Sequence, residues 1–181
     1  MRVDIWSDVV CPFCFIGKKR LEKAAEQAGV ELEVFWHSYQ LDPDAPIRQE
    51  KSNSERLAEK YNRSIAEVEE MQRNIAAMAK EEGIEFNWEN ANSGNTFNAH
   101  RIIHLAQSLN LGNEAKEAFF YSYMTQGLAI GERETIEDVA ARIGLNPNQV
   151  EDVLNSDEFA EFVKYDEEVA RDQLKVTGVP F

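Results

Sequence analysis

Two cysteines, Cys11 and Cys14, stand near the start of the chain in a Cys-Pro-Phe-Cys motif with Pro12 and Phe13 between them. At the start of a helix this spacing suits dithiol–disulfide exchange, because one helical turn brings the two sulfurs within reach of each other. The 181 residues contain no other cysteine, so the pair is not part of a structural disulfide scaffold. The motif therefore predicts a redox centre.

The order of the motif residues predicts different roles for the two cysteines. Cys11 falls at the N-cap of the expected helix, and Pro12 falls at its first helical position. The free amides of the first turn favour negative charge, which predicts a lowered pKa for Cys11 and makes it the nucleophile. Cys14 lies one turn deeper, where it is expected to attack a mixed disulfide and release the substrate. Phe13, at an exposed helix start, is a candidate substrate contact.

The segments around the motif predict a strand–helix–strand unit. Residues 2–7 are expected to form a strand, and the helix that begins at the motif is expected to end at Gly29. Residues 31–37 first alternate between polar and apolar side chains and then become apolar, a pattern that is typical of a second buried strand. A right-handed βαβ unit with an α/β fold follows from this order.

Residues from about 54 to 172 are expected to be almost entirely helical after a loop at 41–46. Their predicted helix starts are marked by capping residues: Ser64, Thr96, Asn113, Thr135, Asn146 and Ser156. No internal repeat or flexible linker divides the chain. The simplest organisation is half of an α/β sheet interrupted by a helical insertion, with a new strand beginning close to residue 181.

Charge and hydropathy exclude several classes of protein. The formal net charge of −14 disfavours nucleic acid and anionic membranes as partners, since both require clustered lysine and arginine. No apolar run is long enough to cross a membrane, and the first residues lack the apolar stretch of a signal peptide. These features predict a cytoplasmic protein.

The cysteine pair has two alternative roles, which the motif by itself leaves open. Cys11 and Cys14 could supply half of a zinc site, whose two further ligands would come from among His37, His100 and His104. They could also be inert buried thiols, although a helix-opening Cys-Pro-x-Cys directly after a strand is an unusual context for those. No metal and no cofactor is expected in the preferred interpretation.

Three segments together resemble the FrnE-like branch of the DsbA family of thiol–disulfide oxidoreductases: residues 7–14, residues 95–100 and residues 178–181. The resemblance runs through essentially the whole chain. It implies a thioredoxin-like fold with a helical insertion domain, divided into an N-terminal βαβ half (1–50), a mainly helical insertion with its return helix (51–172) and the start of the C-terminal half (173–181). It also implies that the C-terminal strands and helix of the family lie beyond residue 181.

The resemblance further implies positions around the cysteines. Val179 and Pro180 match the family's cis-proline loop, where the backbone of Val179 could pair with an extended substrate. His100 lies in the second family-like segment and could line the site, with a satisfied buried histidine as the plainer alternative. The motif carries Phe13 where strongly oxidising members have histidine, which predicts a lower reduction potential.

The expected activity is thiol–disulfide exchange with protein or small-molecule thiols. Glutathione or a thioredoxin-type reductant is the candidate redox partner, and in a reducing cytoplasm the net reaction is expected to be reduction, isomerisation or a redox response. A glutathione-dependent isomerase or transferase, of the 2-hydroxychromene-2-carboxylate isomerase or kappa type, is the alternative. Those relatives typically carry serine near the helix start, whereas this chain has both cysteines.

Overall fold

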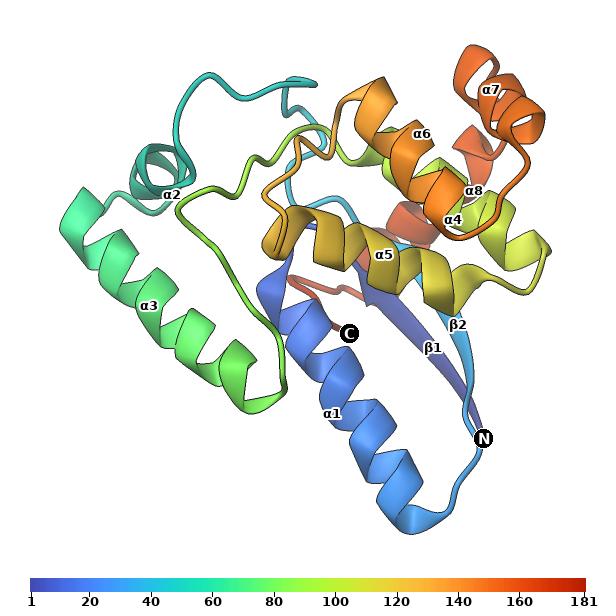
Figure 1. Cartoon of the computed structure of the whole chain (residues 1–181), viewed down its shortest axis with the longest axis horizontal. Coiled ribbons are helices and arrows are strands. Elements are labelled where there is room, and N and C mark those ends of the chain that lie inside the picture. Colours follow the sequence, from blue (N-terminus) through green and yellow to red (C-terminus); the bar gives the residue numbers. More distant parts are fainter.

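A pair of parallel strands joined by one long helix forms the base of the fold, in a computed structural model that describes all 181 residues (Figure 1). Strand β1 spans Arg2–Ser7, helix α1 spans Pro12–Ala28 and strand β2 spans Glu33–Ser38. The strands are paired in parallel over their whole length. The predicted βαβ unit is therefore confirmed, with the second strand beginning two residues later than expected.

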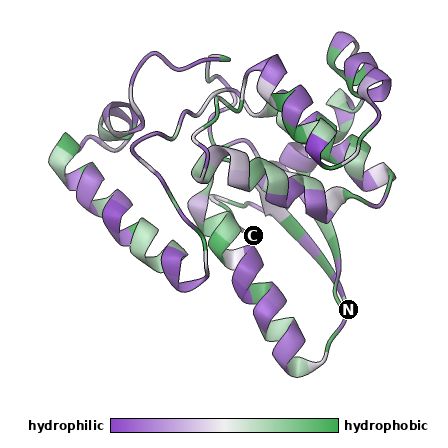
Figure 2. Cartoon of the chain, viewed as in Figure 1, coloured by the Kyte–Doolittle hydropathy of each residue, from purple (hydrophilic) through white to green (hydrophobic).

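Helix α1 begins and ends where the sequence predicts. Cys11 is its N-cap residue in an extended conformation and Pro12 is its first helical residue, while Gly29 ends it with a left-handed φ of 64°. The buried residues of α1 lie in its N-terminal half, beginning with Cys14 and Phe15. Figure 2 shows the same division as a hydrophobic upper end and a mainly hydrophilic lower half. Packing therefore holds the end of α1 that carries the cysteines.

Seven further α-helices follow β2, and none is long and apolar enough to cross a membrane. They are α2 (Asn53–Tyr61), α3 (Ile65–Glu81), α4 (Phe97–Ser108), α5 (Gly112–Met124), α6 (Arg133–Arg142), α7 (Pro147–Asn155) and α8 (Ala160–Glu168), which runs into a π-helical turn, η1 (Val169–Gln173). In Figure 1, α2 and α3 lie on one side of α1, and α4 to α8 lie on the other side over the strands. The predicted helical insertion is thus two groups of helices around α1.

Some of these helices begin at the predicted capping residues and others do not. Ser64 and Asn146 cap α3 and α7, since their side chains accept hydrogen bonds from backbone amides of the first turn. At the start of α4 the side chain of Asn95, not that of Thr96, accepts the amide of Phe97. Thr96 is nonetheless the N-cap residue of α4, as predicted, whereas three other predicted starts are wrong: Asn113 and Thr135 lie inside α5 and α6, and Ser156 lies before α8. Packing sets these helix starts, because a capping side chain contributes only about 1 kcal/mol.

One apolar core joins the βαβ unit to the helices. A cluster of 28 buried residues includes Phe15 of α1, Trp36 of β2 and Phe120 of α5. The rings of Phe15 and Phe120 are stacked with centroids 5.0 Å apart. Because this core is continuous, α5 fixes the position of α1 from the side opposite α3.

The end of the described chain returns to β1. The amide of Trp6 donates to the carbonyl of Phe181 at 3.0 Å, and the amide of Phe181 donates back to the carbonyl of Trp6 at 3.2 Å. The Val179–Pro180 peptide bond directly before this pairing is cis, as the family resemblance implies. These hydrogen bonds hold residues 179–181 against the strand that leads into the cysteine motif.

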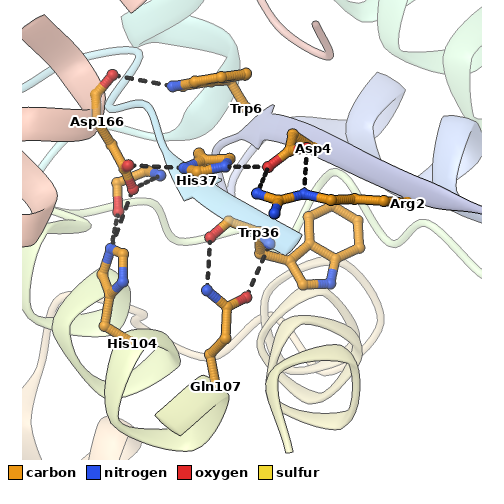
Figure 3. Close-up of polar contacts among 9 residues, drawn as sticks. Arg2, Asp4, Trp6, Trp36, His37, His104, Gln107 and Asp166 are labelled. Atoms are coloured by element: carbon orange, nitrogen blue, oxygen red, sulfur yellow. Dashed lines mark hydrogen bonds and ion pairs between the residues drawn. The ribbon is translucent and has the colours of Figure 1, made fainter. Parts of the chain in front are cut away.

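A buried carboxylate attaches α8 to the edge of β2 (Figure 3). Asp166 accepts hydrogen bonds from the amide of Ser38 at 2.8 Å and from His37 at 2.7 Å, and it lies 3.2 Å from His104. The indole of Trp6 donates to the Asp166 carbonyl and is stacked on the ring of His37. These contacts hold the return helix to the sheet.

His37 lies between two carboxylates, because its second ring nitrogen is 3.0 Å from Asp4. Burial opposes its positive charge, but the hydrogen bonds to Asp166 and Asp4 outweigh burial and raise the pKa of His37. Burial likewise opposes the charge of Asp166, yet its hydrogen bonds with the two histidines and Ser38 lower its pKa to about 2. The charged forms of His37 and Asp166 therefore stabilise the fold together.

We expect replacement of His37 by glutamine to destabilise the fold most at low pH. A raised pKa in the folded state gives a stabilisation that is complete below the unfolded value of 6.5 and is lost as the pH rises through the folded value. The loss should be about 1–3 kcal/mol near pH 5.5 and smaller near pH 8.5, as urea unfolding can measure. An equal loss at both pH values would contradict this assignment.

Candidate active site

Cys11 and Cys14 are both reduced and buried, with 4% and 2% of their surface exposed. Cys11 lines a cleft of about 550 Å³ that opens between the start of α1, the α2–α3 pair and residues 177–179, whereas Cys14 does not line it. Pro12 and Phe13 also line the cleft, and Phe13 is 46% exposed. Of the two sulfurs, the one at the helix start is therefore the one that a bound molecule meets.

The loop with the cis peptide bond forms one wall next to Cys11. The thiol of Cys11 donates to the carbonyl of Val179 at 3.5 Å, across a separation of 168 residues in sequence. Pro180 packs on α1 at Gly17, where an added Cβ would lie 3.5 Å from the proline ring. The fold thus brings Val179 and Pro180 from the far end of the chain to the cysteine motif.

A fully buried lysine lies on the other side of the cysteine pair. The ammonium group of Lys116, on α5, donates to the carbonyl of Ser7 at 3.0 Å. It also lies 5.5 Å from the ring centre of Trp36 and 5.4 Å from that of Phe120. Burial is the main reason that the pKa of Lys116 is lowered to about 8, while the charges of Cys14 and Asp8 oppose that shift. Near neutral pH, the side chain of Lys116 is therefore a positive charge that is buried in the protein interior.

Asp8 is the buried carboxylate of the same region. It accepts the amide of Leu41 at 2.7 Å and lies 3.3 Å from the imidazole of His100. Burial alone would raise its pKa, but the contacts with His100 and Leu41 and the charge of Lys116 lower it. The pKa of His100 is lowered, chiefly by burial, so a neutral imidazole donates its Nε2 proton to the carboxylate.

The ionisation of each cysteine depends on the other in these surroundings. Contact with Cys14 and desolvation raise the pKa of Cys11 well above its ordinary value. Desolvation also opposes ionisation of Cys14, but the contact with Cys11 and the charge of Lys116 lower the pKa of Cys14. In the reduced pair the first negative charge therefore lies on the sulfur nearer to Lys116.

The expectation that the helix start lowers the pKa of Cys11 is thus wrong for the reduced pair. The amide of Cys14 does lower it, as the helix argument requires, but the neighbouring sulfur and burial have larger effects. Transfer of the Cys11 proton to Cys14 would place the charge on the sulfur that lines the cleft. The arrangement can therefore produce a nucleophile at Cys11 when a substrate separates the two sulfurs.

The three histidines do not gather at the cysteines. His100 contacts Asp8, His104 contacts Ser38 and Asp166, and His37 is held by the two carboxylates already described. No group of three or more His, Cys, Asp or Glu side chains is arranged to hold a metal ion. The two additional ligands that a zinc site on Cys11 and Cys14 would need are not supplied, and His100 lies beside Asp8 instead of a sulfur.

Two residues of this region are functional candidates that the sequence patterns did not indicate. Asp8 stands three residues before Cys11, within the segment that carries the family resemblance. Lys116 stands three residues before the Phe119–Phe120 pair, on the buried face of an amphipathic helix. A lysine at an apolar position of a helix is the signal that could have identified Lys116.

We expect the substitution Lys116→Met to reduce the thiolate population of the reduced pair at pH 7 by about ten-fold, because it removes an opposite charge that lowers the Cys14 pKa. Methionine fills a similar volume, and Asp8 keeps its contacts with His100 and the amide of Leu41, so the fold should be retained. Thiolate absorbance at 240 nm, followed against pH, measures the effect. Lys164→Met, on the exposed face of α8, is the matched control. Equal titration of both variants and the unmodified protein would contradict a role for Lys116.

Comparison with known proteins agrees with this geometry. Residues 2–181 match the model of the DSBA-like thioredoxin domain family. The crystal structure of a probable DsbA oxidoreductase from Streptomyces coelicolor is 32% identical, has a TM-score of 0.91, and is matched over 100% of this chain and 79% of its own. The cytosolic disulfide reductase DsbM from Pseudomonas aeruginosa is 14% identical, with a TM-score of 0.68 over 99% of this chain and 82% of its own. A 2-hydroxychromene-2-carboxylate isomerase is 19% identical, with a TM-score of 0.70 over 99% and 83% of the two chains. The chain belongs to the DSBA-like thioredoxin domain family.

Proposed function

We propose that the chain is a thiol–disulfide oxidoreductase in which Cys11 is the nucleophile and Cys14 is the resolving cysteine. The observation that carries this proposal is the unequal placement of two reduced cysteines: Cys11 lines the cleft beside Val179, and Cys14 does not. Val179, Phe13 and Pro12 are proposed to form substrate contacts because they line the cleft with Cys11, and Pro180, which packs on α1 at Gly17, is proposed as a further contact.

The proposed cycle includes the transfer of one proton between the sulfurs of Cys11 and Cys14. A substrate disulfide approaches Cys11 from the cleft, the proton passes to Cys14, and the Cys11 thiolate attacks to form a mixed disulfide. Cys14 then loses that proton again, which the neighbouring charge of Lys116 favours, and attacks Cys11 to release the second thiol. His100 is proposed to act indirectly, by holding the carboxylate of Asp8 in place.

We propose reduction or isomerisation, in the cytoplasm, as the net direction. Phe13 cannot donate a hydrogen bond to a thiolate at Cys11, so the reduced form lacks the stabilisation that makes a strong oxidant. The structural similarity to a cytosolic disulfide reductase is in keeping with this direction, although at 14% identity it shows the fold alone. Glutathione or a thioredoxin-type protein is the proposed reductant, and DsbM has a structure with glutathione.

The alternative function is a glutathione-dependent isomerase, whose fold is similar at 19% identity. Such an enzyme uses glutathione without a two-cysteine cycle, so Cys14 would have no chemical role. The burial of Cys14 between Cys11, Ser7 and the charge of Lys116 favours the oxidoreductase. The two functions are separated by the experiment that follows.

We expect the variant Cys14→Ser to accumulate a mixed disulfide at Cys11, because the resolving sulfur is gone. Intact mass measurement after incubation with glutathione disulfide should detect one bound glutathione per chain, and Cys11→Ser should bind none. An unmodified Cys14→Ser protein that still supports glutathione-dependent isomerisation would favour the alternative function.

We expect the Cys11–Cys14 pair to have a reduction potential well below the roughly −120 mV of a strong oxidant. Equilibration with glutathione buffers and mass measurement of the oxidised fraction gives the potential. The substitution Phe13→His should raise it, because an imidazole beside Cys11 stabilises the thiolate, whereas Phe13→Leu should leave it nearly unchanged. A potential near −120 mV in the unmodified protein would reverse the proposed direction.

A further inference from the structure

The cleft at Cys11 has a charge that is opposite to that of the whole chain. Its ionisable lining includes three cations, Arg56, Lys60 and Arg171, and two carboxylates, Asp8 and Asp42. The chain as a whole has a formal charge of −14. This cleft therefore has a local excess of positive charge next to Cys11 in a chain that is acidic as a whole.

None of the three cations in the cleft is neutralised by an ion pair. Arg56 donates to the side-chain oxygen of Asn53 at 3.0 Å, and Lys60 donates to the carbonyl of Leu41 at 3.3 Å. Arg171 donates to the carbonyl of Gln40 at 2.7 Å and to the Tyr39 hydroxyl. All of these acceptors are neutral, so the guanidinium and ammonium charges remain available to an anion.

Arg56 is the most deeply placed of the three. Lys60 and Arg171 are exposed, whereas Arg56 is half-buried and its Nε is buried without any hydrogen-bond partner. A buried donor without a partner costs about 1–3 kcal/mol, and in a cleft a ligand can supply the missing acceptor. The planar guanidinium suits a carboxylate, which can accept two parallel hydrogen bonds.

We propose that the cleft binds a low-molecular-weight disulfide or thiol that carries carboxylate groups, with Arg56 as the residue that recognises the carboxylate. The proposal rests on the thiol–disulfide exchange proposed above and names its substrate class. The volume of about 550 Å³ is typical of a small-molecule site. Apolar side chains, among them Leu57, Met71 and Ile75, also line the cleft and can pack on the stem of such a ligand.

The exchange is balanced without any additional reactant. The thiolate of Cys11 attacks one sulfur of the disulfide RS–SR, so that a Cys11–SR bond forms and one RS⁻ leaves and is protonated by water. The thiolate of Cys14 then attacks Cys11, the Cys11–SR bond breaks, and the second RS⁻ leaves. The protein is oxidised to the Cys11–Cys14 disulfide, and its two electrons reduce RS–SR to two thiols.

A series of disulfides with the same two-methylene spacer and different terminal charge tests this substrate class. The pre-reduced protein is oxidised in a single turnover by 3,3′-dithiodipropionate (two negative charges), bis(2-hydroxyethyl) disulfide (neutral) or cystamine (two positive charges). Each rate is divided by that of free dithiothreitol with the same disulfide, which removes differences in leaving-group reactivity. Arg56→Gln should slow the dianion by about ten-fold or more and the neutral disulfide by less than about two-fold, and Arg56→Lys should retain part of the preference.

Arg73→Gln is the matched control, since Arg73 is exposed on α3, is paired with Glu70 and does not line the cleft. An equal effect of Arg56→Gln on all three disulfides, or an equal effect of Arg73→Gln on the dianion, would overturn the proposal. If the Arg56 variants fail to fold, the proposal is tested by the salt dependence of the oxidation rates of the unmodified protein. Its preference for the dianion over the neutral disulfide should fall as salt is added, whereas a rise would mean that the overall negative charge governs binding.

The outcome also separates this proposal from the proposed function. If none of the three disulfides oxidises the Cys11–Cys14 pair, thiol–disulfide exchange itself is rejected. If all three oxidise it without regard to charge, exchange stands and only the carboxylate-bearing substrate class is rejected.

Discussion

The ammonium group of Lys116 is fully buried, and the polar groups around the cysteines compensate its charge. Its direct contacts are one backbone carbonyl and two aromatic rings, which do not by themselves replace hydration of a full charge. The carboxylate of Asp8 and the ionisable sulfur of Cys14 supply the opposite charge. A negative charge at the cysteine pair therefore also makes burial of the lysine less unfavourable. The thiolate and the buried ammonium group of Lys116 stabilise each other.

This interdependence makes the helices after β2 part of the candidate active site. Lys116 comes from α5, and His100, which fixes Asp8, comes from α4. The stacking of Phe15 on Phe120 then sets the distance between α1 and α5, so a change in that packing would alter the charge felt by Cys14. At the far edge of the sheet, Asp166 performs the corresponding task for α8 by joining it to β2.

The two faces of Cys11 have different environments. Towards the interior it meets Cys14 and the fixed charges behind it, which control when a thiolate forms. Towards the cleft it meets Val179, Phe13 and a set of cations without ion-pair partners, which control what can approach. The residues proposed to control thiolate formation therefore differ from those proposed to control substrate binding. Substitution of Lys116 is expected to change the thiolate titration, and substitution of Arg56 is expected to change the rates with charged disulfides.

Local sequence patterns were sufficient for the elements next to the motif. The alternation in β1, the proline after Cys11 and the glycine at position 29 each act within a few residues, so their structural consequences can be inferred without the rest of the fold. The same holds for the Ser64 cap, whose partner Glu67 is three residues away. Thr135 and Ser156 are equally good capping residues, but packing between helices moved those starts elsewhere. The sequence by itself determined the βαβ unit and the helical character of the middle of the chain, and it indicated Cys11 and Cys14 as the candidate reactive pair.

Only the tertiary structure decided that Asp8 meets His100, that Lys116 lies behind Cys14 and that Arg56 remains without a carboxylate. The first two of these relations join residues that are far apart along the chain. The third depends on the absence of a carboxylate next to the Arg56 guanidinium. The tertiary structure also raises the Cys11 pKa, which the helix start was expected to lower, because the neighbouring sulfur and burial exceed the effect of the helix start. Such effects depend on distances through the folded interior, which spacing along the chain does not specify.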